Sequence, residues 1–183
     1  MNPQVREMRM KQLFFPLLMV AAAIQAGAAV TDSSPNGFTL KVTVDIKAAP
    51  GIVYDNVVKN IGRWWDPAHT FSGDSANLSI EEKALGCFCE KVKGGMSRNM
   101  QVIYFVPGET LVMTGAPGLL RDMAATATMS IGFTAAEGGT RVSVTYAVGG
   151  YSPAGLDKLA REVDGVLLTQ FTRLKNFIEN GKP

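Results

Sequence analysis

Strict alternation of apolar and polar residues marks the first well-defined element of the chain. In FTLKVTVDIK, residues 38–47, five apolar side chains alternate with five polar ones, which predicts a half-buried strand of an antiparallel sheet. The following AAPGIVYDNVVKN changes to helical spacing, and Pro50 suits a first helical turn. We therefore expect a short helix that ends near Asn60 and a second helical turn from Ile61 to Trp65.

The middle of the chain has the pattern of strands separated by turns. Glycine and Pro-Gly breaks divide it into short apolar segments, and their spacing favours hairpins over crossover helices. The expected strands are Leu78–Ala84, Cys87–Val92, Arg98–Val106, Thr110–Thr114, Ala124–Ala135 and Thr140–Val148.

A long amphipathic helix is expected at the C-terminal end. Ser152 and Pro153 suit a helix cap and first turn, and apolar residues recur at helical spacing from Leu156 to Ile178, which predicts a helix of about 26 residues. This helix is the only element large enough to cover the apolar face of the sheet. The fold class is therefore α+β: about seven antiparallel strands, two short helices after the first strand, and a cavity where the curved sheet cannot close on the long C-terminal helix.

The N-terminus has the features of a secretory signal peptide. The basic residues Arg6, Arg9 and Lys11 precede an apolar run over 13–24, and small residues follow at 26–29. The run is about a dozen residues long, short of the roughly 20 needed to span a bilayer. An uncleaved membrane anchor is the competing interpretation.

Cleavage after Ala28 would divide the chain into a signal peptide (1–28), a flexible lead-in (29–37) and a single domain (38–183). We then expect the protein in the periplasm or outside the cell, without a stable membrane anchor. The whole chain has 18 basic and 16 acidic side chains, and the signal peptide removes three basic residues and one acidic residue, which leaves 15 of each. A net charge near zero disfavours nucleic-acid binding.

The stretch RWWDPAHTFSG, residues 63–73, holds both tryptophans and the only histidine. Adjacent tryptophans cannot point the same way, so one indole is interpreted as a core anchor and the other as a partly exposed lid or a ligand wall. For His69 three roles compete: structural hydrogen bonding, general base and metal ligand. A base needs an orienting partner, for which Asp66 and Asp74 are near in sequence.

The pentapeptide GCFCE contains the only two cysteines. Strand alternation places Cys87 and Cys89 on one face and Phe88 with Glu90 on the other. Three interpretations compete for the cysteines. The first is a disulfide, which export favours, although residues i and i+2 of a strand lie near the upper limit of disulfide geometry. The second is a metal site that also uses His69 and one more ligand. The third is two small apolar side chains that face the core.

The chain from Phe38 to Asn180 resembles the SRPBCC superfamily, which includes START lipid-transfer domains, pollen-allergen-like proteins and polyketide cyclases. The resemblance is carried by the first strand with IKAAPGIVYDNVVKNIGRWW, and by the strand TRVSVTYAV that leads into the long helix. WWDPAHTFSGD together with GCFCE is similar to a group of exported bacterial members. The resemblance implies a helix-grip fold with an apolar cavity between sheet and helix, and it implies no single reaction.

The function we expect is that of an exported binding protein for an apolar small molecule such as a lipid, a polyketide or an aromatic compound, with no cofactor. GAPGLLRDMA, residues 115–124, places Leu119 and Leu120 in a turn-rich segment, either as a lid on the cavity or as a loop packed on the core. The candidate ligand-binding residues are Trp64, Trp65, His69, Phe71, Cys87, Cys89, Met100, Met113 and Met129.

Two alternatives compete with this function. The first is a cyclase or dehydratase, with His69 and either Asp66 or Tyr146 acting on the bound ligand. The second is a metal or redox module built on His69, Cys87 and Cys89. No feature of the sequence points to a particular oligomeric state.

Overall fold

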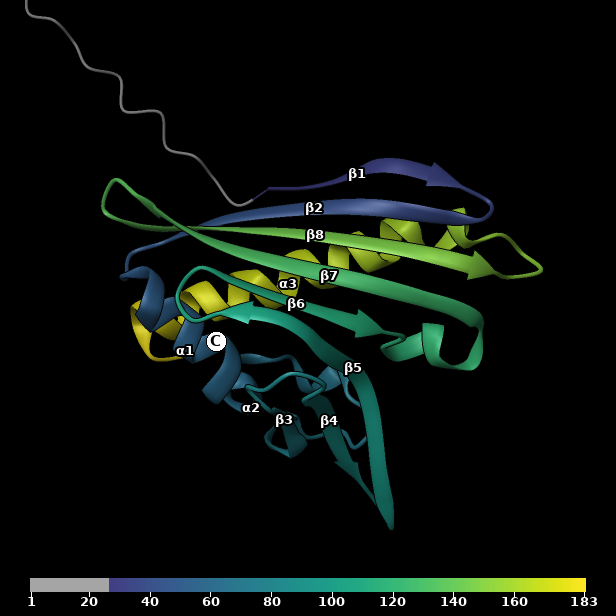
Figure 1. The fold of residues 1–183 in the computed structure, drawn as a ribbon, viewed down its shortest axis with the longest axis horizontal. Coiled ribbons are helices and arrows are strands. Elements are labelled where there is room, and N and C mark those ends of the chain that lie inside the picture. The colour runs from purple at the N-terminus through teal and green to yellow at the C-terminus, as the bar shows by residue number, and fades with distance from the viewer. Residues whose placement is uncertain (1–26) are drawn as a thin grey trace, which may run out of the picture.

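An eight-stranded antiparallel sheet packs against one long helix in the computed structural model, which describes residues 27–183. The order across the sheet is β1-β2-β8-β7-β6-β5-β4-β3, and the long helix α3, Ala160–Asn180, lies behind it (Figure 1). This is the expected helix-grip arrangement. The strands are β1 Gly27–Ser34, β2 Gly37–Ile46, β3 Leu78–Ile80, β4 Cys87–Val92, β5 Gly95–Val106, β6 Thr110–Gly115, β7 Ala124–Ala136 and β8 Gly139–Tyr151.

Short helices connect these elements. The two helices expected after β2 are present as α1, Pro50–Lys59, and α2, Ile61–Trp64. Within residues 27–183, short stretches of 3-10 helix occur at four further places: η1 Pro67–His69, η2 Ser75–Asn77, η3 Gly118–Asp122 and η4 Leu156–Leu159.

The alternating side chains of β2 form the centre of the core. All five apolar residues, from Phe38 to Ile46, are buried, whereas the polar residues between them are not. The same alternation continues in β8, where Val142, Val144 and Tyr146 are buried on the same face. The periodicity of the sequence therefore identifies the face of the sheet that α3 covers.

The flexible lead-in expected over 29–37 is contradicted by strand β1. Gly27–Ser34 pairs with β2 from Gly27 opposite Thr43 to Ser34 opposite Gly37, with one irregularity between Val30 and Asp32. Backbone hydrogen bonds hold this strand, and its side chains are nearly all exposed, so it has no apolar pattern from which to predict it. The sheet has eight strands rather than about seven, and the expected cleavage point after Ala28 falls within β1. The rest of the expected signal peptide, residues 1–26, lies outside the described residues.

The C-terminal helix begins later than expected. Gly155 has φ +85°, its N–H donates to the Ser152 carbonyl, and the N–H of Leu156 donates to the Pro35 carbonyl at 2.9 Å. These bonds form a turn at residues 152–155 that a continuous helix cannot follow. Consequently α3 has 21 residues. In the described part of the chain, no helix combines the length and hydropathy that a membrane span requires.

Candidate functional site

A cavity of about 360 Å³ lies between the inner face of the sheet, α3 and two loops. Its wall is mainly aromatic and aliphatic, which is the character of a small-molecule site. The lining residues come from the 65–71 loop, β4, β5, the η3 segment, β7, β8, η4 and α3: Trp65, Ala68, His69, Thr70, Phe71, Phe88, Glu90, Asn99, Met100, Pro117, Gly118, Leu119, Leu120, Met129, Tyr146, Leu159, Glu162, Val163, Val166 and Leu167.

The two adjacent tryptophans take different positions. Trp64 is 1 % exposed in the core, and its indole N–H donates to the Asn56 carbonyl at 3.0 Å. Trp65 is half-buried, lines the cavity and packs edge-on against Phe88 with ring centres 5.7 Å apart. Trp64 anchors the loop, and Trp65 forms part of the cavity wall.

His69 lies at the exposed rim of the cavity. Its backbone carbonyl accepts a hydrogen bond from the Trp65 indole N–H at 3.2 Å. Asp66, expected as a possible orienting partner, instead accepts from the Ala68 N–H at 3.0 Å, and Asp74 accepts from the Ala76 N–H at 2.9 Å. Both carboxylates cap short helical turns, so neither orients the imidazole.

The η3 segment closes one side of the cavity mouth. Leu120 is buried and Leu119 is 62 % exposed, and both line the cavity. The guanidinium of Arg121 lies over the ring of Phe71, 3.9 Å from its centre. This cation–π contact, here called the clasp, joins η3 to the loop that carries Trp65 and His69.

Glu90 is a buried carboxylate in the cavity wall that sequence reasoning did not select. It is 1 % exposed, and its Oε1 accepts a hydrogen bond from the Ser72 backbone N–H at 2.6 Å. Its place on the same strand face as Phe88 follows from alternation, but an isolated glutamate two residues from an aromatic gives no signal of burial.

Asn99 reaches the cavity because of a β-bulge. Phe88 pairs with Met100 and Cys89 with Arg98, so Asn99 is an extra residue of β5, and both Asn99 and Met100 line the cavity. The neighbouring strand approaches closely here. A Cβ on Gly115 would lie 2.6 Å from the Asn99 carbonyl oxygen and 2.7 Å from the Met100 Cα, so only glycine fits.

Tyr146 provides a phenol to the same cavity from β8. Its side chain is 2 % exposed, and burial raises the pKa of the phenol well above its ordinary value. The group is therefore a neutral hydrogen-bond donor at pH 7. Among the described residues its hydroxyl has no hydrogen-bond partner, which leaves it available to a ligand.

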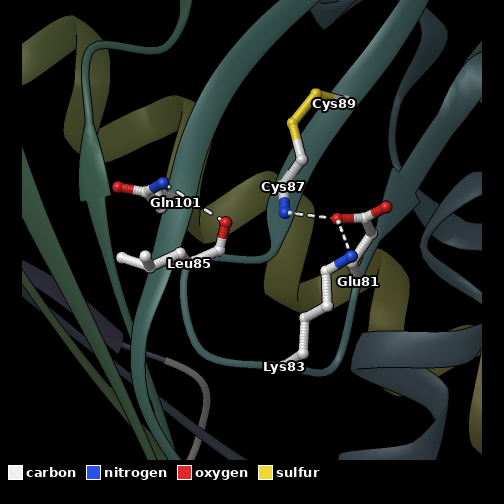
Figure 2. The surroundings of a disulfide bond; sticks show 6 residues. All are labelled: Glu81, Lys83, Leu85, Cys87, Cys89 and Gln101. Carbon is white, nitrogen blue, oxygen red and sulfur yellow. Dashed lines mark hydrogen bonds and ion pairs between the residues drawn. A yellow bond between two sulfur atoms is a disulfide. The ribbon is translucent and has the colours of Figure 1, made fainter.

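The cysteines form a disulfide at the edge of this site (Figure 2). Their Cα atoms are 5.3 Å apart, within the range of ordinary disulfides. The Cys87 N–H donates to Glu81 Oε2 at 3.2 Å, and the same oxygen pairs with Lys83 at 3.3 Å. The disulfide interpretation thus agrees with the structure. The interpretations as two unbonded core side chains or as metal ligands do not, and residues 27–183 contain no cluster of three metal-ligating side chains.

Six of the expected site residues line the cavity together: Trp65, His69, Phe71, Met100, Met129 and Tyr146. The others lie elsewhere. Met113 and Trp64 are core residues, Asp66 is a cap, and Cys87 and Cys89 belong to the strand face opposite Phe88 and Glu90, because β4 alternates there. These five residues are absent from the cavity wall.

Comparison with known proteins identifies solved structures of similar fold. No family model and no curated protein matches the sequence. An uncharacterised protein from Rhizobium leguminosarum is 18% identical over 84% of this chain and 97% of that chain, with a TM-score of 0.59. CalU16 from Micromonospora echinospora is 12% identical over 87% and 85%, with a TM-score of 0.56.

DynU16, a protein in the dynemicin biosynthetic locus, is 16% identical over 78% of this chain and 48% of that chain, with a TM-score of 0.54. At such identities the similarity concerns the fold alone. Together with the sheet order and the C-terminal helix, it establishes that residues 27–183 form an α+β domain of the helix-grip type.

Proposed function

We propose that this protein is an SRPBCC superfamily member that binds an apolar small molecule in the cavity between sheet and α3. The cavity carries the proposal, because it is concave, largely apolar and about 360 Å³ in volume. Small-molecule pockets begin at about 300 Å³, and a cavity of about 150 Å³ admits benzene. The volume suits a ligand of two or three rings. The similarity to DynU16, a protein in a biosynthetic locus, supports a small-molecule ligand.

We place the protein in an oxidising compartment outside the cytoplasm. The basic and apolar pattern of residues 1–28 supports export. The Cys87–Cys89 disulfide supports it independently, since disulfides persist in the periplasm and outside the cell and are rare in the cytosol.

Fluorescence titration with N-phenyl-1-naphthylamine (NPN), a neutral three-ring probe, tests the binding function. We expect the protein to bind it and Val166→Trp to weaken that binding at least tenfold, because Val166 lines the cavity and an indole would fill it. Thr169→Trp is the matched control, since Thr169 is exposed on the same helix and outside the cavity wall. A folded Val166→Trp variant with unchanged affinity would show that the probe binds elsewhere.

A cyclase or dehydratase is the second candidate, now with Tyr146 as the proton donor. One observation favours it: the neutral phenol of Tyr146 and the buried carboxylate of Glu90 line the same apolar cavity. Two such groups on a bound ligand are the elements of general acid–base catalysis. Native followed by denaturing mass spectrometry of wild type and Tyr146→Phe separates the two functions. A binding protein retains the same small molecule in both, whereas an enzyme retains product in wild type and substrate in the variant.

A further inference from the structure

The charged side chains that line the cavity are both carboxylates, whereas the Arg121 guanidinium lies over Phe71 at the mouth. Glu90 and Glu162 both belong to its wall, Glu90 inside and Glu162 at the exposed end. Across the described residues, no lysine or arginine lines the cavity. Within residues 27–183, His69 at the rim is the one basic side chain of the wall, so the buried carboxyl group of Glu90 has no lysine or arginine beside it in the cavity.

Glu90 lacks a charged partner. Its Oε1 accepts the Ser72 N–H, but within residues 27–183 it forms no ion pair, and its second oxygen, Oε2, accepts no hydrogen bond from the protein. A carboxylate that is almost fully buried without a cation is unfavourable. Because Glu90 lies in the cavity wall, a ligand in the cavity is the group that can supply the missing charge.

Aromatic rings surround the same space. Trp65, Phe88 and Tyr146 line it beside Phe71, whose ring the Arg121 guanidinium covers, and the faces of aromatic rings attract cations electrostatically. Tyr146 and Asn99 also bring hydrogen-bonding groups to the wall. An aromatic wall with one buried carboxylate provides the elements that recognise an organic cation.

We propose that the ligand of this cavity is an apolar amine, whose protonated nitrogen pairs with Glu90 while its rings or hydrocarbon body fill the aromatic wall. The proposal rests on the binding function argued above and narrows the ligand class. A carboxylate ligand such as a fatty acid would place its negative charge beside Glu90 without a cation in the wall. Like charges at short range oppose such binding.

Three probes of equal ring size and different charge test this proposal: 1-naphthylmethylamine, 1-naphthalenemethanol and 1-naphthoic acid. Isothermal titration at pH 7 should give the amine an affinity at least tenfold higher than the alcohol and show no measurable binding of the acid. Glu90→Gln should reduce the ratio of amine to alcohol affinity to about one. Glu137→Gln, an exposed substitution in the β7–β8 turn with the same change in net charge, should leave that ratio unchanged.

The outcomes test the amine proposal and the binding function separately. If the alcohol or the acid binds wild type as tightly as the amine, the amine proposal is wrong and the binding function stands. The same conclusion follows if NPN binds and none of the three probes does. If NPN fails as well, both proposals are wrong. The wild-type ranking of the probes decides the matter even if Glu90→Gln does not fold.

Discussion

The Arg121 guanidinium lies over the Phe71 ring at 3.9 Å and so connects η3 to the loop on the other side of the cavity mouth. Arg121 also pairs with Asp122 at 3.2 Å, but both side chains of that pair are exposed. An exposed ion pair contributes little, whereas a cation–π contact contributes about 0.5–1 kcal/mol. The clasp therefore contributes more than the ion pair to holding η3 against the Phe71 loop, and a contact of this size is weak enough to break when a ligand passes.

Arg121→Ala should speed ligand release. Loss of a contact of about 0.5–1 kcal/mol corresponds to roughly a two- to fivefold higher dissociation rate of NPN, measured by stopped-flow fluorescence. The free energy of unfolding should fall by no more than about 1 kcal/mol, since the same contact is lost in the folded state. Arg161→Ala, exposed on α3 and outside the cavity wall, is the control. An unchanged release rate in Arg121→Ala would mean that the mouth opens by another route.

Substitution of Trp64 should mainly lower stability, whereas substitution of Trp65 should mainly weaken ligand binding. Trp64→Phe removes buried volume and the hydrogen bond to the Asn56 carbonyl, and we expect it to lower the free energy of unfolding by about 2 kcal/mol. Trp65→Phe alters the half-buried cavity wall and should cost under about 1 kcal/mol of stability while weakening NPN binding severalfold. Urea unfolding and NPN titration of both variants check this, and equal effects on both quantities would contradict the assignment.

Periodicity predicts the parts of this fold that are held by side-chain burial. The alternating residues of β2, β7 and β8 are buried on the inner face. The helical spacing of apolar residues predicts α3 for the same reason, because those residues are buried against the sheet. Strand β1 could not be predicted in this way, because its pairing with β2 depends on backbone groups while its side chains remain in solvent.

The cavity wall was predictable only in part. Trp65, Phe71 and Tyr146 stand out by residue type or by alternation, and they line the cavity. Asn99 does not, because the bulge in β5 shifts the alternation by one residue. Glu90 follows the alternation, but whether its carboxylate is buried depends on the loop that brings the Ser72 N–H to it, and contacts between distant segments leave no local pattern.

The Cys87–Cys89 disulfide should contribute modestly to stability and little to ligand affinity. It closes a loop with a single intervening residue, and the chain-entropy relation gives about 1.5 kcal/mol for so short a loop. The double variant Cys87→Ala/Cys89→Ala should therefore remain folded and bind NPN within about twofold of wild type, because the cavity wall is built from Phe88 and Glu90 on the other strand face. Urea unfolding checks that the variant is folded, and NPN titration checks its affinity. A thiol count of the wild type checks that the disulfide is formed. A tenfold loss of NPN affinity would show that the disulfide shapes the cavity.

Two carboxylates tie α3 and β8 to strand β2 and should make stability depend on pH. Asp45 accepts two hydrogen bonds from the Arg141 guanidinium, at 2.9 and 3.0 Å, which lower its pKa below the ordinary 3.8 although burial opposes the shift. Burial also acts to raise the pKa of Glu179, but hydrogen bonds from the Lys175 ammonium at 2.6 Å and the Lys47 N–H at 2.8 Å outweigh it, and the pKa falls below the ordinary 4.5.

A lowered pKa in the folded state means that the folded protein binds fewer protons than the unfolded chain near pH 4. The stability contributed by Asp45 and Glu179 is therefore fully present above about pH 5 and is lost as the pH falls through the folded pKa values.

At pH 7, Glu179→Gln should lower the free energy of unfolding by about 1 kcal/mol, since a hydrogen bond to a charged group contributes about 1.5–3 kcal/mol and the amide keeps part of it. Asp45→Asn should cost less, because solvent screens the half-buried Asp45–Arg141 pair. Thermal unfolding from pH 7 to pH 3 should show the difference between each variant and wild type shrinking on the acid side, with Glu137→Gln as the exposed control. A difference that stays constant down to pH 3 would mean that these carboxylates stabilise the fold through packing rather than charge.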